Sequence, residues 1–110
     1  MVFTAIVHFW TAPGKEEEMK AVLKEAAAIY LKDEGTLNWF IMQDSKDPTA
    51  WSVVERYEGG AFYSTLLTDG YFIQSLKLHM ENPHFKKFMT NVGPLEDPAR
   101  ERQILTHNEL

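Results

Sequence analysis

Residues 2–10 alternate in a way that leaves both sides of a predicted strand largely apolar. The segment is rich in β-branched and aromatic residues and contains neither Gly nor Pro, which is typical of strands. A strand that is apolar on both faces needs cover on both faces. The two alternate sets are Phe3, Ala5, Val7 and Phe9 on one side, and Val2, Ile6, His8 and Trp10 on the other.

Residues 11–35 show the strongest helical period in the chain. Pro13 and the acidic run 16–18 suit a helix N-terminus, and Gly35 suits the turn after its end. The apolar positions recur at the i, i+3 and i+4 spacing of an amphipathic helix. They are Met19, Val22, Leu23, Ala26, Ala27 and Tyr30.

Two further strands are predicted over residues 36–44 and 50–58, with a turn at 45–49 between them. The short connection predicts an antiparallel hairpin. In the first strand, Leu37, Trp39 and Ile41 share one side, and Phe40 and Met42 share the other. In the second, one face carries Trp51, Val53, Glu55 and Tyr57.

Residues 59–89 are predicted to be helical but interrupted, because Gly59-Gly60 and Asp69-Gly70 punctuate the segment. Asn82 has the character of an N-cap, with Pro83 at the first helical position. Residues 102–108 form the last predicted strand.

The predicted order is β-α-β-β-α-β, which indicates an α+β, ferredoxin-like fold with an antiparallel four-stranded sheet. Helices in this fold cover one face of the sheet. The other face is also apolar here, so we expect a second copy to cover it, sheet against sheet, in a homodimer. We expect residues 1–110 to form a single domain.

Composition excludes several classes of function. The net charge is −5, and 13% of the residues are aromatic. A chain without a long basic run is a poor candidate for nucleic acid or anionic membranes. The absence of cysteine excludes disulfides and thiolate chemistry. The first ten residues contain no cationic leader, and no apolar run is long enough for a membrane span, which favours a cytoplasmic protein.

Several short motifs resemble the antibiotic biosynthesis monooxygenase (ABM) family. They are Val54-Glu55-Arg56-Tyr57, His79, Asn82-Pro83-His84-Phe85 and the "APGKEEEM" helix start. The resemblance covers most of the chain and implies a dimeric α+β barrel. Compared with the family pattern, residues of about 59–74 add roughly a dozen positions, and we interpret them as an insertion near the pocket.

The resemblance implies a choice among chemistries. Some members of the family oxygenate phenols or quinols without a cofactor, some degrade haem, and some isomerise small metabolites. The haem-degrading branch uses an Asn on the first strand and a late helical His. Neither is present here, and the second position falls near Met89. The leading hypothesis is a monooxygenase without a cofactor, acting on a small aromatic, quinol or polyketide-like compound.

Oxygenation without a cofactor requires a base, donors for the resulting anion, and a dry aromatic pocket. His79 is the predicted general base, although a helical His bonded to a backbone carbonyl would leave the same pattern. Tyr57, or another hydroxyl in the pocket, is the predicted donor to the anion. The predicted substrate-binding residues are Trp39, Trp51, Tyr30, Asn82, His84 and Phe85, each of which could instead serve the core, a helix cap or the dimer interface. The spacing of His79 and His84 does not favour a metal site.

Two alternatives use the same fold. The base and the pocket could catalyse an isomerisation or another proton transfer. The protein could also be a stress-response module that binds a small molecule without turnover.

Overall fold

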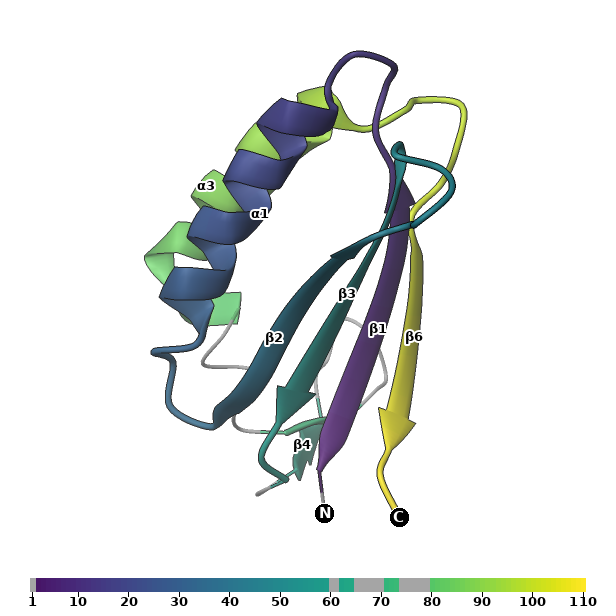
Figure 1. Cartoon of the computed structure of the whole chain (residues 1–110). Helices are drawn as coiled ribbons and strands as arrows, with labels where there is room; N and C mark the ends of the chain where they lie inside the picture. Colours follow the sequence, from purple (N-terminus) through teal and green to yellow (C-terminus); the bar gives the residue numbers. More distant parts are fainter. Residues whose placement is uncertain (1, 60–61, 65–70, 74–79) are drawn as a thin grey trace.

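The computed structural model describes residues 2–59, 62–64, 71–73 and 80–110. A four-stranded antiparallel sheet has the order β2-β3-β1-β6, formed by β1 (Phe3–Trp10), β2 (Thr36–Gln43), β3 (Ala50–Tyr57) and β6 (Gln103–Asn108). Helices α1 (Glu16–Tyr30) and α3 (Pro83–Val92) lie on one face of this sheet, and a short 3-10 turn, η1 (Gly93–Leu95), follows α3 (Figure 1). The predicted fold class is confirmed.

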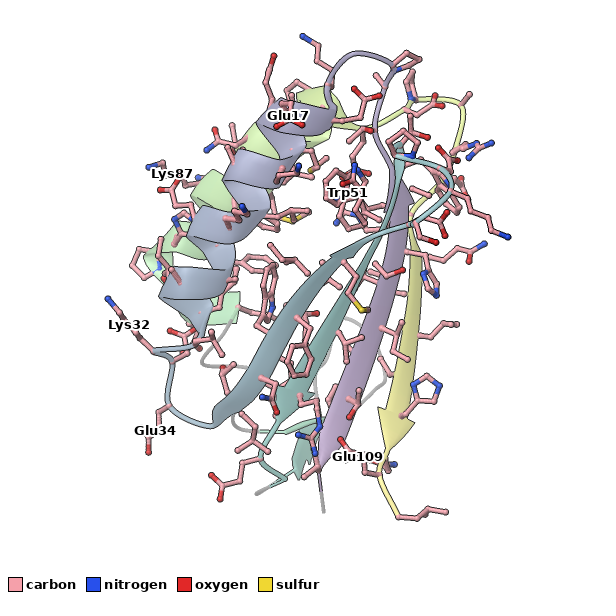
Figure 2. The ribbon with its side chains drawn as sticks, in the orientation of Figure 1. Glu17, Lys32, Glu34, Trp51, Lys87 and Glu109 are labelled. Atoms are coloured by element: carbon pink, nitrogen blue, oxygen red, sulfur yellow. The ribbon has the colours of Figure 1, made fainter. Side chains whose placement is uncertain are left out.

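The core lies between the helices and the sheet face that they cover, which we call the inner face. Of the six periodic positions of α1, four are buried: Met19, Leu23, Ala26 and Tyr30. Trp51 extends from the sheet toward the helices, whereas Lys87 lies on the exposed side of the helix layer, away from the sheet (Figure 2). The alternation along β1 and β3 therefore assigns inner and outer positions as the sequence predicted.

The opposite, outer face of the sheet carries an apolar row that crosses all four strands. Strand register places Phe40 beside Val54, Val54 beside Ile6, and Ile6 beside Leu105. Phe40 and Leu105, at the two ends of this row, are exposed. A large exposed apolar patch on a protein surface is typical of a site that binds a partner.

The helical prediction for residues 59–89 is wrong for two short stretches. β4 (Phe62–Ser64) and β5 (Tyr71–Ile73) form a two-stranded antiparallel sheet, with Phe62 opposite Ile73. Both stretches are rich in aromatic residues, which favour strands, and their pairing satisfies backbone groups that a helix would otherwise have bonded. The insertion assigned to residues 59–74 stays a prediction.

The C-terminal residues are fixed to the outer side of the sheet by one carboxylate. Arg56 donates two hydrogen bonds to Glu109, from Nε and Nη2 at 2.8 Å each, and the Thr4 hydroxyl donates a third. Glu109 lies near both chain ends (Figure 2). The hydrogen bonds from Arg56 and then Thr4 lower the pKa of Glu109 from about 4.5 to about 2.

This lowered pKa predicts a specific response to acid. A carboxyl whose folded-state pKa is depressed stabilises the fold above its ordinary pKa and loses that contribution as pH falls through the folded value. The free energy of unfolding should therefore fall more steeply between about pH 5 and pH 2 in the wild type than in Glu109→Gln. Urea denaturation across this range measures the difference. The exposed Glu101 provides the control variant Glu101→Gln, and equal slopes in all three proteins would contradict the prediction.

Within the described residues, no helix combines the length and the apolar character needed to cross a membrane.

Candidate functional site

A cavity of about 360 Å³ lies between the inner face of the sheet and helix α3. Its volume falls at the small end of the range for ligand pockets. Most of its wall is apolar, and the polar side chains among its described lining residues are Glu55, Arg102 and Thr106. The apolar part of the wall includes Phe3, Val7, Phe9, Val53, Met80, Phe85, Phe88, Met89, Val92 and Ile104.

The polar part of the cavity floor is a single row across the sheet. Strand register places Trp39 beside Glu55, Glu55 beside Ala5, and Ala5 beside Thr106. All four residues line the cavity. The side chain of Ala5 is short, so it leaves space above the sheet between the carboxyl of Glu55 and the hydroxyl of Thr106.

The neighbouring row toward the other end of the strands is apolar throughout, with Ile41, Val53, Val7 and Ile104 in register. The cavity floor therefore combines one polar row with an apolar surround. This is the composition expected of a site for a largely apolar ligand that carries a few oxygen atoms.

Among the described residues, two donors from the same face of the sheet hold the Glu55 carboxyl. The Trp39 indole Nε1 and the Tyr57 hydroxyl both donate to Oε1, the latter at 3.0 Å. Burial raises the pKa of Glu55, and this outweighs the opposing effects of the two hydrogen bonds and of the Arg102 charge. A carboxyl with this pKa keeps its proton at higher pH than an exposed glutamate does.

Tyr57 itself is fully buried beside this carboxyl. Burial and then the charge of Glu55 raise the pKa of the Tyr57 hydroxyl. The phenol therefore stays protonated and acts as a donor to Glu55. Tyr57 is not among the residues that line the cavity.

Arg102 occupies the wall at the β6 side of the cavity. It forms an ion pair with Glu96, and its Nη1 lies 3.7 Å from the Met89 sulfur. These contacts fix the Arg102 guanidinium at the cavity wall. Its positive charge acts to lower the pKa of Glu55, against the effect of burial.

The predicted binding residues fall into two groups. Trp39 and Phe85 line the cavity. Tyr30 and Trp51 are buried in the core, and Tyr30 packs edge-on against Trp39 with ring centroids 5.1 Å apart. The His84 ring packs edge-on against Tyr30, with ring centroids 5.5 Å apart, and His84 does not line the cavity. His79, the predicted base, lies outside the described residues.

Asn82 is a helix cap, as the sequence predicted. Its Oδ1 accepts a hydrogen bond from the His84 backbone N–H at 2.9 Å, and Pro83 occupies the first turn. Its Nδ2 donates to Asp33 Oδ1 at 2.6 Å, which joins the start of α3 to the turn after α1. Both ends of the amide are thus engaged by the protein, and a contact to substrate stays a prediction.

This double role gives Asn82→Ala a measurable cost. Loss of an N-cap side chain costs about 1 kcal/mol, and loss of a bond to a charged group adds to it. We expect the midpoint of thermal unfolding to fall by about 4 °C or more, measured by calorimetry or circular dichroism. Asn91→Ala, at an exposed position of the same helix, is the matched control. An Asn82→Ala midpoint no lower than that of the control would contradict the role of the cap.

Glu55 is the residue that the sequence prediction did not assign. The alternation placed it on the inner face with Trp51, Val53 and Tyr57, and a charged residue in such a row was the available signal. Carboxylates are seldom buried without a partner. Which partners Glu55 has depends on the pairing of β3 with β2, and therefore on the tertiary structure.

A second hollow, of about 570 Å³, is lined by residues that include His8, Ser52, Asp44 and Gln103. His8 lies on the outer face, where its Nδ1 and the Ser52 Oγ are 2.8 Å apart. His8 therefore faces away from the cavity under the helices. Within the described part of the chain, no three His, Asp or Glu residues are grouped so that they could hold a metal ion.

The family model for "Antibiotic biosynthesis monooxygenase" matches residues 2–91. The chain belongs to this family. Among curated proteins, no sequence matches it. The ABM assignment confirms the resemblance carried by the "VERY" strand and the "NPHF" turn.

Solved structures agree on the ABM fold. A Nitrosomonas europaea protein assigned to the antibiotic biosynthesis monooxygenases is 19% identical, with a TM-score of 0.80 over 99% of this chain and 90% of its own. Pseudomonas aeruginosa PA3566 is 21% identical, with a TM-score of 0.77 over 99% and 94%. A conserved Methanosarcina mazei protein is 19% identical, with a TM-score of 0.78 over 100% and 94%. At these identities the likeness shows the fold.

Proposed function

We propose that the protein is a monooxygenase that needs no cofactor and oxidises a small phenol, quinol or polyketide-like compound in the cavity under α3. The observation that carries the proposal is the floor of this cavity, where a polar row with a half-buried carboxyl crosses an otherwise apolar pocket. Membership of the ABM family supports the same type of reaction. A cytoplasmic location is part of the proposal.

The chemistry balances with O₂ as the second substrate. A base, which we propose to be His79, removes the phenolic proton, and the phenolate passes one electron to O₂. The superoxide and the phenoxyl radical combine at a ring carbon to form a peroxide. The protonated base returns its proton to this peroxide. The distal OH group then leaves together with the hydrogen on that carbon, as one molecule of water, and a quinone remains. One oxygen atom stays in the product, the other leaves as water, and the substrate supplies all four electrons.

The apolar cavity supports this reaction in two ways. Its largely apolar walls surround a bound ligand with groups of low polarity, which strengthens interactions with the anion. Trp39, Phe85 and Phe88 provide aromatic surface for a planar ring.

The working unit in this proposal is a homodimer formed through the outer faces of two sheets. The apolar row from Phe40 to Leu105 supports it, because one copy of the chain leaves both ends of that row exposed. A two-fold axis would place this row against the same row of the second subunit.

Oxygen uptake tests the proposal. Purified protein is mixed with a panel of phenols, hydroquinones and naphthols in ¹⁸O₂, before and after treatment with a chelator. We expect uptake with at least one compound, one ¹⁸O atom in the quinone product, and no change after chelation. Isomerised product without uptake would replace the monooxygenase by a proton-transfer enzyme. Thermal stabilisation by ligands without any product would indicate a binding protein.

A further inference from the structure

We infer that Arg102 selects ligands that carry a carboxylate, and that the cavity takes a planar aromatic acid with a hydroxyl group at its far end. The inference names the substrate class of the proposed reaction and therefore rests on the proposed function. Arg102 determines specificity in this assignment, because its guanidinium contacts the carboxylate of the ligand. The hydroxyl that is ionised in the reaction belongs to the other end of the same molecule.

Arg102 supplies the positive charge of the cavity wall. Among the lining residues that the structure describes, it is the only lysine, arginine or histidine. It directly precedes β6 and lines the cavity together with Ile104 and Thr106 of that strand. Its side chain is 24% exposed. The charge is therefore partly shielded from water, and an ion pair formed there is stronger than one at an open surface.

The partners of Arg102 leave part of its guanidinium for a ligand. Within the described part of the chain, Nη2 donates to Glu96, and Nη1 lies 3.7 Å from the sulfur of Met89. A guanidinium has five N–H donors, and a thioether sulfur is only a weak acceptor. A carboxylate oxygen is a much better acceptor for Nη1, and the flexible side chain of Met89 can move aside for it.

Glu96 holds the guanidinium in place without facing the ligand. It forms an ion pair with Arg102, and its own side chain is 17% exposed. Glu96 is not among the residues that line the cavity, whereas Arg102 and Met89 are. A ligand in the cavity therefore meets the cation before it meets this carboxylate. The planar fork of an arginine held in this way suits a carboxylate oxygen pair.

The polar groups of the cavity are separated by apolar floor. Arg102 lies four residues before Thr106, which belongs to the polar row of the floor. Four extended residues span at most about 14 Å. Ile104, from the apolar row, lies between them, and Ala5 leaves space beside Thr106. An apolar ring system with a carboxylate at the Arg102 end and a hydroxyl at the Thr106 end matches this arrangement.

Binding of 6-hydroxy-2-naphthoate and of its carboxamide tests the inference. The two probes share the rings and the hydroxyl, but only the naphthoate is charged at pH 7. We expect the wild type to bind the naphthoate about tenfold more tightly than the carboxamide or better, as for a hydrogen bond between two charged groups. Fluorescence titration measures both dissociation constants.

Arg102→Met should remove this preference for the naphthoate. The ratio of the two dissociation constants within one protein cancels any general damage to the cavity. Because Arg102→Met leaves Glu96 without its partner, the double variant Arg102→Met with Glu96→Gln repeats the test without an unpaired carboxylate. Arg102→Lys keeps the charge without the fork and should keep part of the preference. Circular dichroism and thermal unfolding verify that the variants fold.

Arg100→Met is the matched control, since it changes the net charge by the same amount. Arg100 is exposed and does not line the cavity. Its guanidinium carbon lies 5.2 Å from the centroid of the Trp10 ring. We expect Arg100→Met to keep the full preference of the wild type for the naphthoate.

Three results would overturn the inference: a wild type that binds the naphthoate no better than the carboxamide, a preference that persists in Arg102→Met and in the double variant, or a preference lost equally in Arg100→Met. Its failure is distinguishable from failure of the proposed function. Uptake of O₂ with uncharged phenols, by a protein that shows no preference for the naphthoate, removes the aromatic acid and leaves the monooxygenase. An Arg102-dependent preference without any uptake removes the monooxygenase and leaves the class of ligand.

Discussion

Leu105→Glu should convert the proposed homodimer into a folded monomer. Leu105 ends the apolar row of the outer face and is 48% exposed in the single chain, so glutamate there costs the isolated fold little. In a two-fold dimer each substitution occurs twice, and each buries a charge with no partner built for it. We expect the dissociation constant of the dimer to rise by about 100-fold or more, measured by sedimentation over a range of concentrations.

Leu31→Glu is the matched control for this experiment. Leu31 has the same exposure, 48%, but follows α1 and lies outside the row from Phe40 to Leu105. We expect it to leave the dissociation constant unchanged. A wild type that sediments as a monomer at working concentration would remove the dimer from the proposal, and so would a Leu105→Glu protein that is still dimeric.

His79→Ala should lower turnover by about 100-fold or more with whichever phenol or quinol supports oxygen uptake. Proton removal by a positioned side chain contributes about 10²–10⁴-fold to a rate. The imidazole is the side chain that changes charge in the neutral range, so wild-type turnover should fall on acidification as the base becomes protonated. His79→Ala should lose that part of the pH profile along with most of its rate.

His107→Ala controls for the general effect of removing an imidazole. His107 is exposed, and its position in β6 places it on the outer face, away from the cavity. Its rate and pH profile should match those of the wild type. If His79→Ala kept both the rate and the acid limb of the profile, another group would have to be the base, and Glu55 would be the first candidate among the cavity-lining residues.

Local signals in the sequence were sufficient for most of the architecture. Strict alternation in β1 and β3 assigned inner and outer faces, since successive side chains of a strand point to opposite sides. Asn82 followed by Pro83 predicted a cap that the structure confirms through a bond to the His84 backbone. These predictions are confirmed because each depends on residues that are close together in the chain. The exception is the pair of strands at residues 62–64 and 71–73. Their pairing was not predicted, because the local pattern indicated a helix.

The chemistry of the site depended instead on residues that are distant in the chain. The sequence by itself determined that Glu55 lies on a largely apolar strand face. Only the tertiary structure decided that Trp39 from β2 and Tyr57 both bind its Oε1, that Arg102 lies near it, and that Ala5 leaves space beside it. The physical reason is that burial and neighbouring charges set a pKa, and strand pairing brings those neighbours together from separate parts of the chain.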